Sequence, residues 1–147
     1  MEKMLVLIKP DGVARGLMGK ILSRIEDKGF VIGAMKMLHA DRKLAEELYL
    51  PHKGKGFYEP LVDYITSGPI LALVLSGENL IAQVRAMMGA TDPGKAAPGS
   101  IRGDFGVRIE HNIIHGSDSP ESAEREIAVF FEKTEILDYR NTAAAWL

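Results

Sequence analysis

The sequence predicts an α+β fold, because short apolar runs of strand length alternate with stretches of helical periodicity. The expected order is β-α-β-α-α-β-α-β. Two β-α-β units that meet in one sheet, with helices covering one side, favour a ferredoxin-like βαββαβ sandwich on a four-stranded antiparallel sheet. No linker, charge block or strong repeat interrupts the 147 residues, so we expect one domain, residues 1–147.

The four strands are expected where apolar residues run without interruption. They fall at Met4–Ile8, Phe30–Leu38, Ile70–Leu75 and Asn112–Gly116. The first run stops at Pro10-Asp11-Gly12, which predicts a turn. Ser67-Gly68-Pro69 separates the third strand from the helix before it.

Helices are expected where apolar residues recur at helical spacing. They cover residues 17–25, 41–49, 57–65 and 80–88, and a last helix begins at Pro120. Asp41 and Ser119 are suitable N-caps, and Gly29 is suited to end the first helix. The Gly-, Pro- and Ala-rich stretch 89–100 is predicted to be a long irregular loop, a kind of segment that is often functional.

The composition is that of a globular protein with no strong attraction to polyanions. Hydrophobic residues make up 46% and charged residues 26%, and the formal net charge is −2. No specific nucleic-acid partner is therefore expected. The absence of cysteine excludes disulfides, thiolate metal sites and a cysteine nucleophile. Met4–Ile8 is too short for a signal peptide and Ile70–Leu75 too short to cross a bilayer, so we predict a cytoplasmic protein that does not bind membranes.

One stretch nearly matches a phosphate-binding loop. Residues 89–96 read Gly-Ala-Thr-Asp-Pro-Gly-Lys-Ala, against the pattern G-x-x-x-x-G-K-[ST]. Ala96 stands where the pattern needs a hydroxyl for Mg²⁺, and the stretch follows a predicted helix instead of a strand. A solvated Lys95 in a loop is the simpler interpretation, and an NTP hydrolase that uses Lys95 is the less favoured alternative.

The most informative segment is Asn112-Ile113-Ile114-His115-Gly116-Ser117-Asp118. It resembles the active-site signature of nucleoside diphosphate kinases, N-x-x-H-G-S-D. Four other segments resemble family features at matching places: residues 9–12 (Lys-Pro-Asp-Gly), 67–69 (Ser-Gly-Pro), 102–105 (Arg-Gly-Asp-Phe) and 121–124 (Glu-Ser-Ala-Glu). The resemblance covers essentially the whole chain.

A histidine suits phosphoryl transfer because an imidazole, with an ordinary pKa of about 6.5, is largely neutral and nucleophilic at pH 7. Alone, a histidine at a strand end is more often structural. The resemblance implies that His115 carries a phosphoryl group in a covalent intermediate, with Nδ1 as the attacking atom. Glu126, at the edge of the last helix's apolar stripe, would hold the other nitrogen; its simpler interpretation is a pair with a nearby Lys or Arg.

The resemblance also implies a complete nucleotide site. Arg85, Arg102 and Thr91 would hold phosphates and Tyr49 would lie near the reacting group, as would Lys9, which with Asn112 also binds the sugar hydroxyls. His52 matches a phosphate-contacting histidine of some family members. The base would stack on Phe57, between Leu61 and Ile109, without its edges being read, which favours broad base tolerance.

The implied partners are nucleoside di- and triphosphates. Mg²⁺ would enter with the nucleotide and need no direct protein ligand, although Asp118 is placed to touch it through water. Family members assemble from dimers into hexamers or tetramers, so self-association is expected. Asp92 and His111 depart from residues common in the family. A non-catalytic nucleotide-binding regulatory module is the main alternative to the kinase.

Overall fold

The computed structural model describes residues 1–147, and its centre is a four-stranded antiparallel sheet. The strands are β1 (Glu2–Ile8), β2 (Val31–Leu38), β3 (Ile70–Gly77) and β4 (Ile114–Gly116), in the order β2-β3-β1-β4. Leu5 lies opposite Val74 on one side, and Leu7 lies opposite His115 on the other. The predicted α+β fold with this sheet is confirmed.

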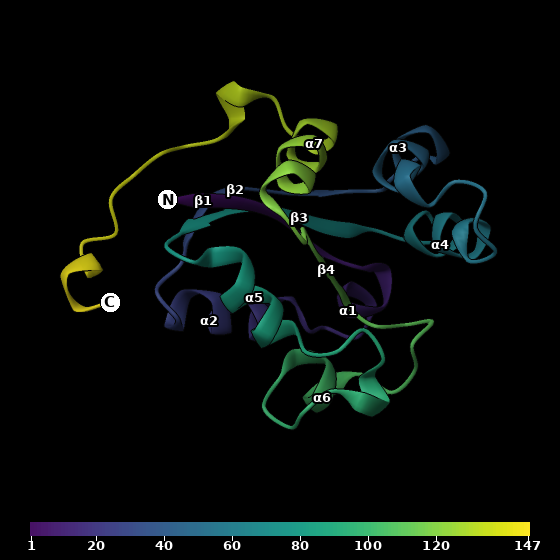
Figure 1. Ribbon diagram of the computed structural model, residues 1–147, viewed down its shortest axis with the longest axis horizontal. Helices are drawn as coiled ribbons and strands as arrows, with labels where there is room; N and C mark the ends of the chain where they lie inside the picture. Colours follow the sequence, from purple (N-terminus) through teal and green to yellow (C-terminus); the bar gives the residue numbers. More distant parts are fainter.

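Seven α-helices and four short 3-10 turns connect or follow the strands (Figure 1). The helices are α1 (Pro10–Ala14), α2 (Met18–Asp27), α3 (Arg42–Leu48), α4 (Tyr58–Ile65), α5 (Leu80–Met88), α6 (Ile101–Phe105) and α7 (Pro120–Phe130). The 3-10 turns are η1 (Leu50–His52), η2 (Pro93–Lys95), η3 (Lys133–Glu135) and η4 (Ala144–Trp146). None of the helices is both long and apolar enough to span a bilayer.

Helices cover both faces of the sheet, so the prediction that they cover one side was wrong. Met4, Val6 and Ile8 of β1 pack with α2 and α5, whereas Leu5 and Leu7 pack with α3, α4 and the end of α7. Figure 1 shows α3 and α7 on one side of the strands and α2 and α5 on the other. A strand buried on both faces needs apolar residues at every position, which is why Met4–Ile8 shows no alternation.

Two helices were missed. Pro10-Asp11-Gly12 is not a simple turn but the start of α1, with the proline at the first helical position, where its missing N–H costs nothing. In α6 the Ser100 side chain caps the helix by accepting from the Gly103 N–H. Gly103 itself looks like a helix breaker in sequence. A Cβ there would lie 2.0 Å from the Ala97 carbonyl oxygen, so close packing requires the glycine.

The predicted helix ends agree with the structure. Asp41 caps α3 by accepting from the Leu44 N–H at 2.8 Å, and Ser119 caps α7 through the Ser122 N–H at 3.1 Å. Gly29 follows α2 with a φ of +93°, a conformation that glycine adopts without strain.

The C-terminal segment after α7 returns along the β2 side of the molecule, in yellow in Figure 1. The Leu137 N–H donates to the Gly33 carbonyl at 2.9 Å, and the Asn141 side chain donates to the Gly29 carbonyl at 3.0 Å. The Tyr139 hydroxyl donates to the Ile32 carbonyl. The segment is therefore fixed mainly to the backbone of the first residues of β2 and of the turn before it.

Candidate active site

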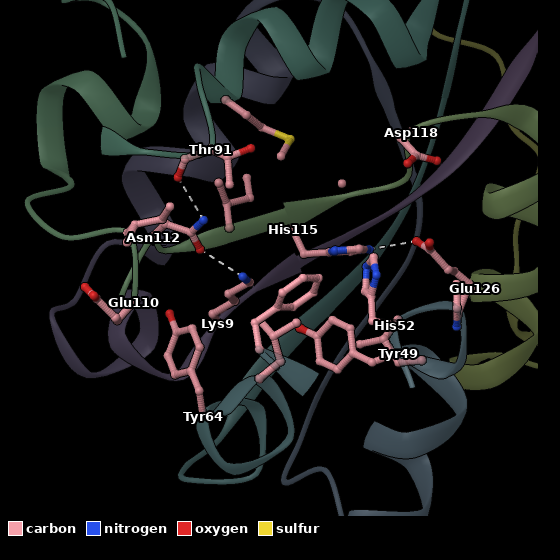
Figure 2. A pocket seen from close by; sticks show the side chains of 18 of the residues that line it. Lys9, Tyr49, His52, Tyr64, Thr91, Glu110, Asn112, His115, Asp118 and Glu126 are labelled. Carbon is pink, nitrogen blue, oxygen red and sulfur yellow. Dashed lines mark hydrogen bonds and ion pairs between the residues drawn. The ribbon is translucent and has the colours of Figure 1, made fainter. Parts of the chain in front are cut away.

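A cavity of about 870 Å³ opens where β1 and β4 meet the hairpin formed by α3, η1 and α4. All the residues that the sequence singled out as a site line it, and Figure 2 labels several of them. They are Lys9, Tyr49, His52, Phe57, Leu61, Arg85, Thr91, Arg102, Ile109, Asn112, His115, Asp118 and Glu126. The fold thus brings together side chains that are up to 117 positions apart, from Lys9 to Glu126.

His115 lies on β4 with its side chain 20% exposed. Its Nε2 is 2.7 Å from Glu126 Oε1 on α7, an interaction drawn in Figure 2. A carboxylate accepts a hydrogen bond, so Nε2 carries the proton and Nδ1 keeps its lone pair. No hydrogen bond within the chain engages Nδ1, which is the nitrogen available to an electrophile in the cavity.

Ser117 completes this arrangement, and the sequence reasoning gave it no role although it stands in the motif. Its fully buried hydroxyl donates to Glu126 Oε1 at 3.0 Å and accepts from the Leu5 N–H at 3.1 Å. The hydroxyl therefore links the Glu126 carboxylate to the centre of the sheet. Such a link fixes the direction of the carboxylate and, through it, of the imidazole.

The backbone before His115 makes a strained turn. Ile113 has a φ of +74°, which is rare for a β-branched residue, and the Ile114 N–H donates to the Asn112 carbonyl at 2.8 Å. This bond across one residue defines a γ-turn. The Lys9 N–H donates to the Ile113 carbonyl at 2.7 Å and holds the turn against β1. The predicted strand Asn112–Gly116 accordingly begins only at Ile114.

A chain of polar contacts runs from Lys9 across the cavity wall. The Lys9 ammonium donates to Asn112 Oδ1 at 2.8 Å, and the Asn112 amide donates to the Thr91 carbonyl at 3.1 Å (Figure 2). Lys9 is only 6% exposed. Burial, followed by the positive charge of Arg102, lowers the pKa of Lys9 to about 8, and the negative charge of Asp11 opposes this shift.

Two arginines donate to the free edge of β4. Arg102 donates to the carbonyls of Gly89, Asn112 and Ile114 at 2.7–3.1 Å, and Arg85 donates to the Gly116 carbonyl at 2.9 Å. Burial, then the neighbouring Arg85, lowers the pKa of Arg102 to about 10. A guanidinium has five N–H donors, so both side chains keep donors for a ligand.

The hairpin, together with Ile109 from the segment before β4, supplies the apolar wall of the cavity. Phe57 and Ile109 are about half exposed, at 49% and 50%, and the His52 ring meets the Phe57 ring edge-on at 5.2 Å. Tyr49 is buried, and its hydroxyl has no hydrogen-bond partner. Burial raises the pKa of Tyr49 well above its ordinary value, so the hydroxyl is a neutral donor awaiting an acceptor.

Arg125 lines the cavity and was also missed by the sequence reasoning. It donates to the Glu47 carbonyl at 3.0 Å, at the C-terminal end of α3, and lies 3.6 Å from Glu126 Oε2. It therefore connects the hairpin to the helix that carries Glu126. In sequence Arg125 falls on the polar face of the last helix, where an arginine carries no functional signal.

The chain matches the family model described as nucleoside diphosphate kinase over residues 2–136. It is 54% identical over 147 residues to a nucleoside diphosphate kinase of Pelotomaculum thermopropionicum, covering 100% of this chain and 99% of that one. It is 52% identical to the enzyme of Archaeoglobus fulgidus, covering 100% and 97%. The chain belongs to the nucleoside diphosphate kinase family.

Solved structures of nucleoside diphosphate kinases agree with this assignment. The chain superimposes with a TM-score of 0.95 on a halophilic nucleoside diphosphate kinase from Halobacterium salinarum in complex with CDP, at 48% identity and with coverage of 99% and 97%. A nucleoside diphosphate kinase family protein from Babesia bovis also gives a TM-score of 0.95, at 39% identity and with 99% of both chains covered.

The nucleoside diphosphate kinase assignment leaves the phosphate-loop alternative without support. Residues 89–96 follow α5, not a strand, and contain the 3-10 turn η2 in place of a helix start. Lys95 is exposed and does not line the cavity that holds His115. The near match to the phosphate-loop pattern is thus a coincidence of glycine and lysine spacing.

Proposed function

We infer that this nucleoside diphosphate kinase moves the γ-phosphate of a nucleoside triphosphate to a nucleoside diphosphate by a ping-pong reaction through phospho-His115. The observation that carries the proposal is that the two imidazole nitrogens of His115 have different surroundings. Nε2 is hydrogen-bonded to Glu126 at 2.7 Å, and Nδ1 is free to react with a ligand in the cavity. Arg85, Arg102 and Lys9 line the same cavity.

In the first half-reaction, Nδ1 forms a bond to the γ-phosphorus as the bond to the bridging oxygen breaks, and that electron pair leaves with the nucleoside diphosphate. The imidazole becomes cationic, and Glu126 stabilises this charge. In the second half-reaction, a terminal oxygen of another nucleoside diphosphate attacks the phosphorus. The N–P electron pair returns to Nδ1, and His115 is restored.

The cations would stabilise charge on the phosphates as it develops. Arg85 and Arg102 offer guanidinium donors, Thr91 a hydroxyl, and Lys9 an ammonium. Tyr49 has the unpartnered hydroxyl that fits an acceptor near the reacting group, and His52 lies on the same wall. We assign Asn112, which is bonded to Lys9, to the sugar hydroxyls together with that lysine.

We assign the base to the half-exposed slot between Phe57, Leu61 and Ile109. Stacking on Phe57 requires only a π-face, so purines and pyrimidines would both bind. The Halobacterium salinarum relative was solved with CDP, a pyrimidine nucleotide. Broad base tolerance follows from a slot whose walls are mainly apolar.

Mg²⁺ would enter as part of the nucleotide complex. Asp118 lines the cavity, and its carboxylate is the type of hard oxygen donor that fits Mg²⁺ through a water molecule. No three His, Cys, Asp or Glu side chains converge as a metal site in the chain, and a nucleotide-borne ion keeps most of its ligands from phosphate and water. The bound ion would neutralise phosphate charge.

We also propose that the chain self-associates through dimers into a tetramer or hexamer, as its resemblance to the family implies. Light scattering of the purified protein measures the mass directly. A monomer at micromolar concentration would refute this part. A cytoplasmic location stays a prediction from the sequence.

Incubation with γ-³²P-ATP and Mg²⁺, without an acceptor, tests the catalytic proposal. Label should appear on the protein, be lost in acid, and transfer to any added nucleoside diphosphate. His115→Ala should remove the label, whereas His39→Ala should not, because His39 contacts the Thr66 carbonyl outside the cavity. Normal labelling of His115→Ala would refute the assignment, and nucleotide binding without any label would favour a regulatory module.

A further inference from the structure

Lys9 needs help to stay charged where it lies. An ammonium has three N–H donors, and within the chain only one is used, by Asn112 Oδ1 at 2.8 Å. The side chain is buried, and the Tyr64 ring centroid lies 5.3 Å from its Nζ. A charge with so few partners is poorly compensated.

The charged groups around Lys9 have opposing effects on its ammonium. Arg102 on α6 repels the ammonium, and Arg85 and His115 face it across the same cavity. Tyr64 on α4 presents a neutral phenol, whose pKa is raised by burial and by Asp11. Asp11 on α1 is the carboxylate that favours the protonated form of Lys9.

The hydrogen bonding of Asp11 does not by itself explain why a carboxylate stands at this position. The Tyr64 hydroxyl donates to Asp11 Oδ1, which ties α4 to α1. The other oxygen, Oδ2, is buried and has no hydrogen-bond partner. A buried carboxylate oxygen without a donor is costly, and a neutral amide oxygen could accept the same Tyr64 hydrogen bond without burying a charge, so the charge itself needs an explanation beyond holding α1 to α4.

We propose that Asp11 and Tyr64 are a positioning pair: Asp11 supplies the counter-charge that keeps the Lys9 ammonium protonated, and Tyr64 fixes Asp11 and the aromatic wall beside that ammonium. Neither residue needs to touch the reacting atoms. Both act through Lys9 on the nucleotide phosphates. The functional half of this inference rests on the function proposed above, whereas the effect of Asp11 on Lys9 does not.

NMR of protein labelled with ¹³C at lysine Cε tests the charge effect without nucleotide. The Lys9 signal is assigned by its loss in Lys9→Arg, and its titration midpoint is compared among variants. Asp11→Asn should lower the midpoint by about one unit, the effect of removing one nearby charge. Asp63→Asn should leave it unchanged, because Asp63 is an exposed carboxylate of α4 outside the cavity.

An unchanged Lys9 midpoint in a folded Asp11→Asn protein would overturn the proposal. If that variant does not fold, Asp11→Ser removes the same charge and decides the question in the same way. Asp11→Glu, which restores the charge, should bring the midpoint back towards the original value.

The consequence for function is measured by the pH profile of kcat/KM. Its alkaline limb should move to lower pH in Asp11→Asn, in step with the Lys9 midpoint. In Tyr64→Phe the alkaline limb should stay in place because Asp11 keeps its charge. KM for the nucleotide should rise roughly three- to tenfold, because Asp11 and the aromatic ring beside Lys9 are held less firmly. An unchanged KM would remove Tyr64 from the pair. A shifted Lys9 midpoint with an unmoved limb would instead contradict the phosphate role of Lys9.

Discussion

At the scale of single residues, the site depends on the partners of the Glu126 carboxylate. Its Oε1 accepts from both His115 and Ser117, and Arg125 lies 3.6 Å from its Oε2. A buried carboxylate needs several such partners to remain ionised. The sequence predicted Glu126 as the partner of His115, and the contact is present. It could not show that a serine two positions after the histidine supports the same carboxylate.

Ser117→Ala should therefore affect both stability and rate. The buried Leu5 N–H loses its side-chain acceptor, which should lower the free energy of unfolding by about 1–3 kcal/mol. Glu126 loses one of its anchors, so kcat should fall by roughly tenfold. Urea unfolding and the nucleotide exchange rate measure the two effects. Ser67→Ala, which removes an exposed hydroxyl, should change neither, and an equally stable Ser117→Ala would contradict our description.

Lys9 should make stability depend on alkaline pH. Its pKa is about 8 in the folded chain and 10.5 ordinarily, so between these values the unfolded chain binds more protons and this group makes the folded state more stable as pH rises. Below pH 8 the folded state carries the full cost of the buried charge. Lys9→Met lacks this dependence. Any advantage of Lys9→Met in thermal unfolding at pH 7 should shrink steadily between pH 8 and 10.5, and a constant difference would count against the shifted pKa.

At the scale of elements, the γ-turn at Ile113 is the least predictable feature of the site. A β-branched residue with positive φ runs against the backbone preference by about 1–2 kcal/mol, and no sequence pattern signals it. The contacts around it hold it in place: the Lys9 N–H binds its carbonyl, and Gly12 packs so closely that a Cβ would lie 3.1 Å from its side chain. The turn is what places Asn112 and His115 on the same cavity wall.

A pair of substitutions measures this strain. Ile113→Ala and Ile113→Gly both remove the buried side chain, but only glycine relaxes the turn, so Ile113→Gly should be the more stable by about 1 kcal/mol. At Ile114, which is equally buried in regular β4, the order should reverse. Chemical denaturation of the four variants gives the comparison. The same order at both positions would mean that the turn stores no strain.

Strands and long helices were predictable from the sequence because their signals are local. Each predicted strand overlaps an observed one, with ends that differ by no more than two residues, and Asp41 and Ser119 cap the helices where expected. The short α1 and α6 were missed because five-residue helices have no periodicity and contain glycines that only close packing explains. The site residues came from the family resemblance, inside the motif and beyond it, and not from spacing alone. Arg125, Tyr64 and Asp11 act through contacts between elements, which no local pattern encodes.

At the scale of the whole molecule, the C-terminal segment stabilises the side of the sheet away from the cavity. Asp138 pairs with Lys3 at 3.0 Å, and a Cβ on Gly29 would lie 2.5 Å from Leu147. Removal of residues 138–147 should lower the melting temperature by several degrees, because about 1–2 kcal/mol of contacts is lost. The kcat should stay within about twofold, since none of these residues lines the cavity. A large loss of kcat would show that the segment influences the site.

The arginines of the site also satisfy the backbone carbonyls at one exposed edge of the sheet. β4 lies last in the strand order, so the carbonyls of Asn112, Ile114 and Gly116 point away from β1, and each accepts from Arg85 or Arg102. Without such partners, a row of backbone carbonyls at a sheet edge is a template to which a strand of another molecule can pair. Arginine-to-alanine changes made to weaken nucleotide binding would therefore also uncover that row. Such variants should aggregate more readily on heating, for a reason unrelated to catalysis.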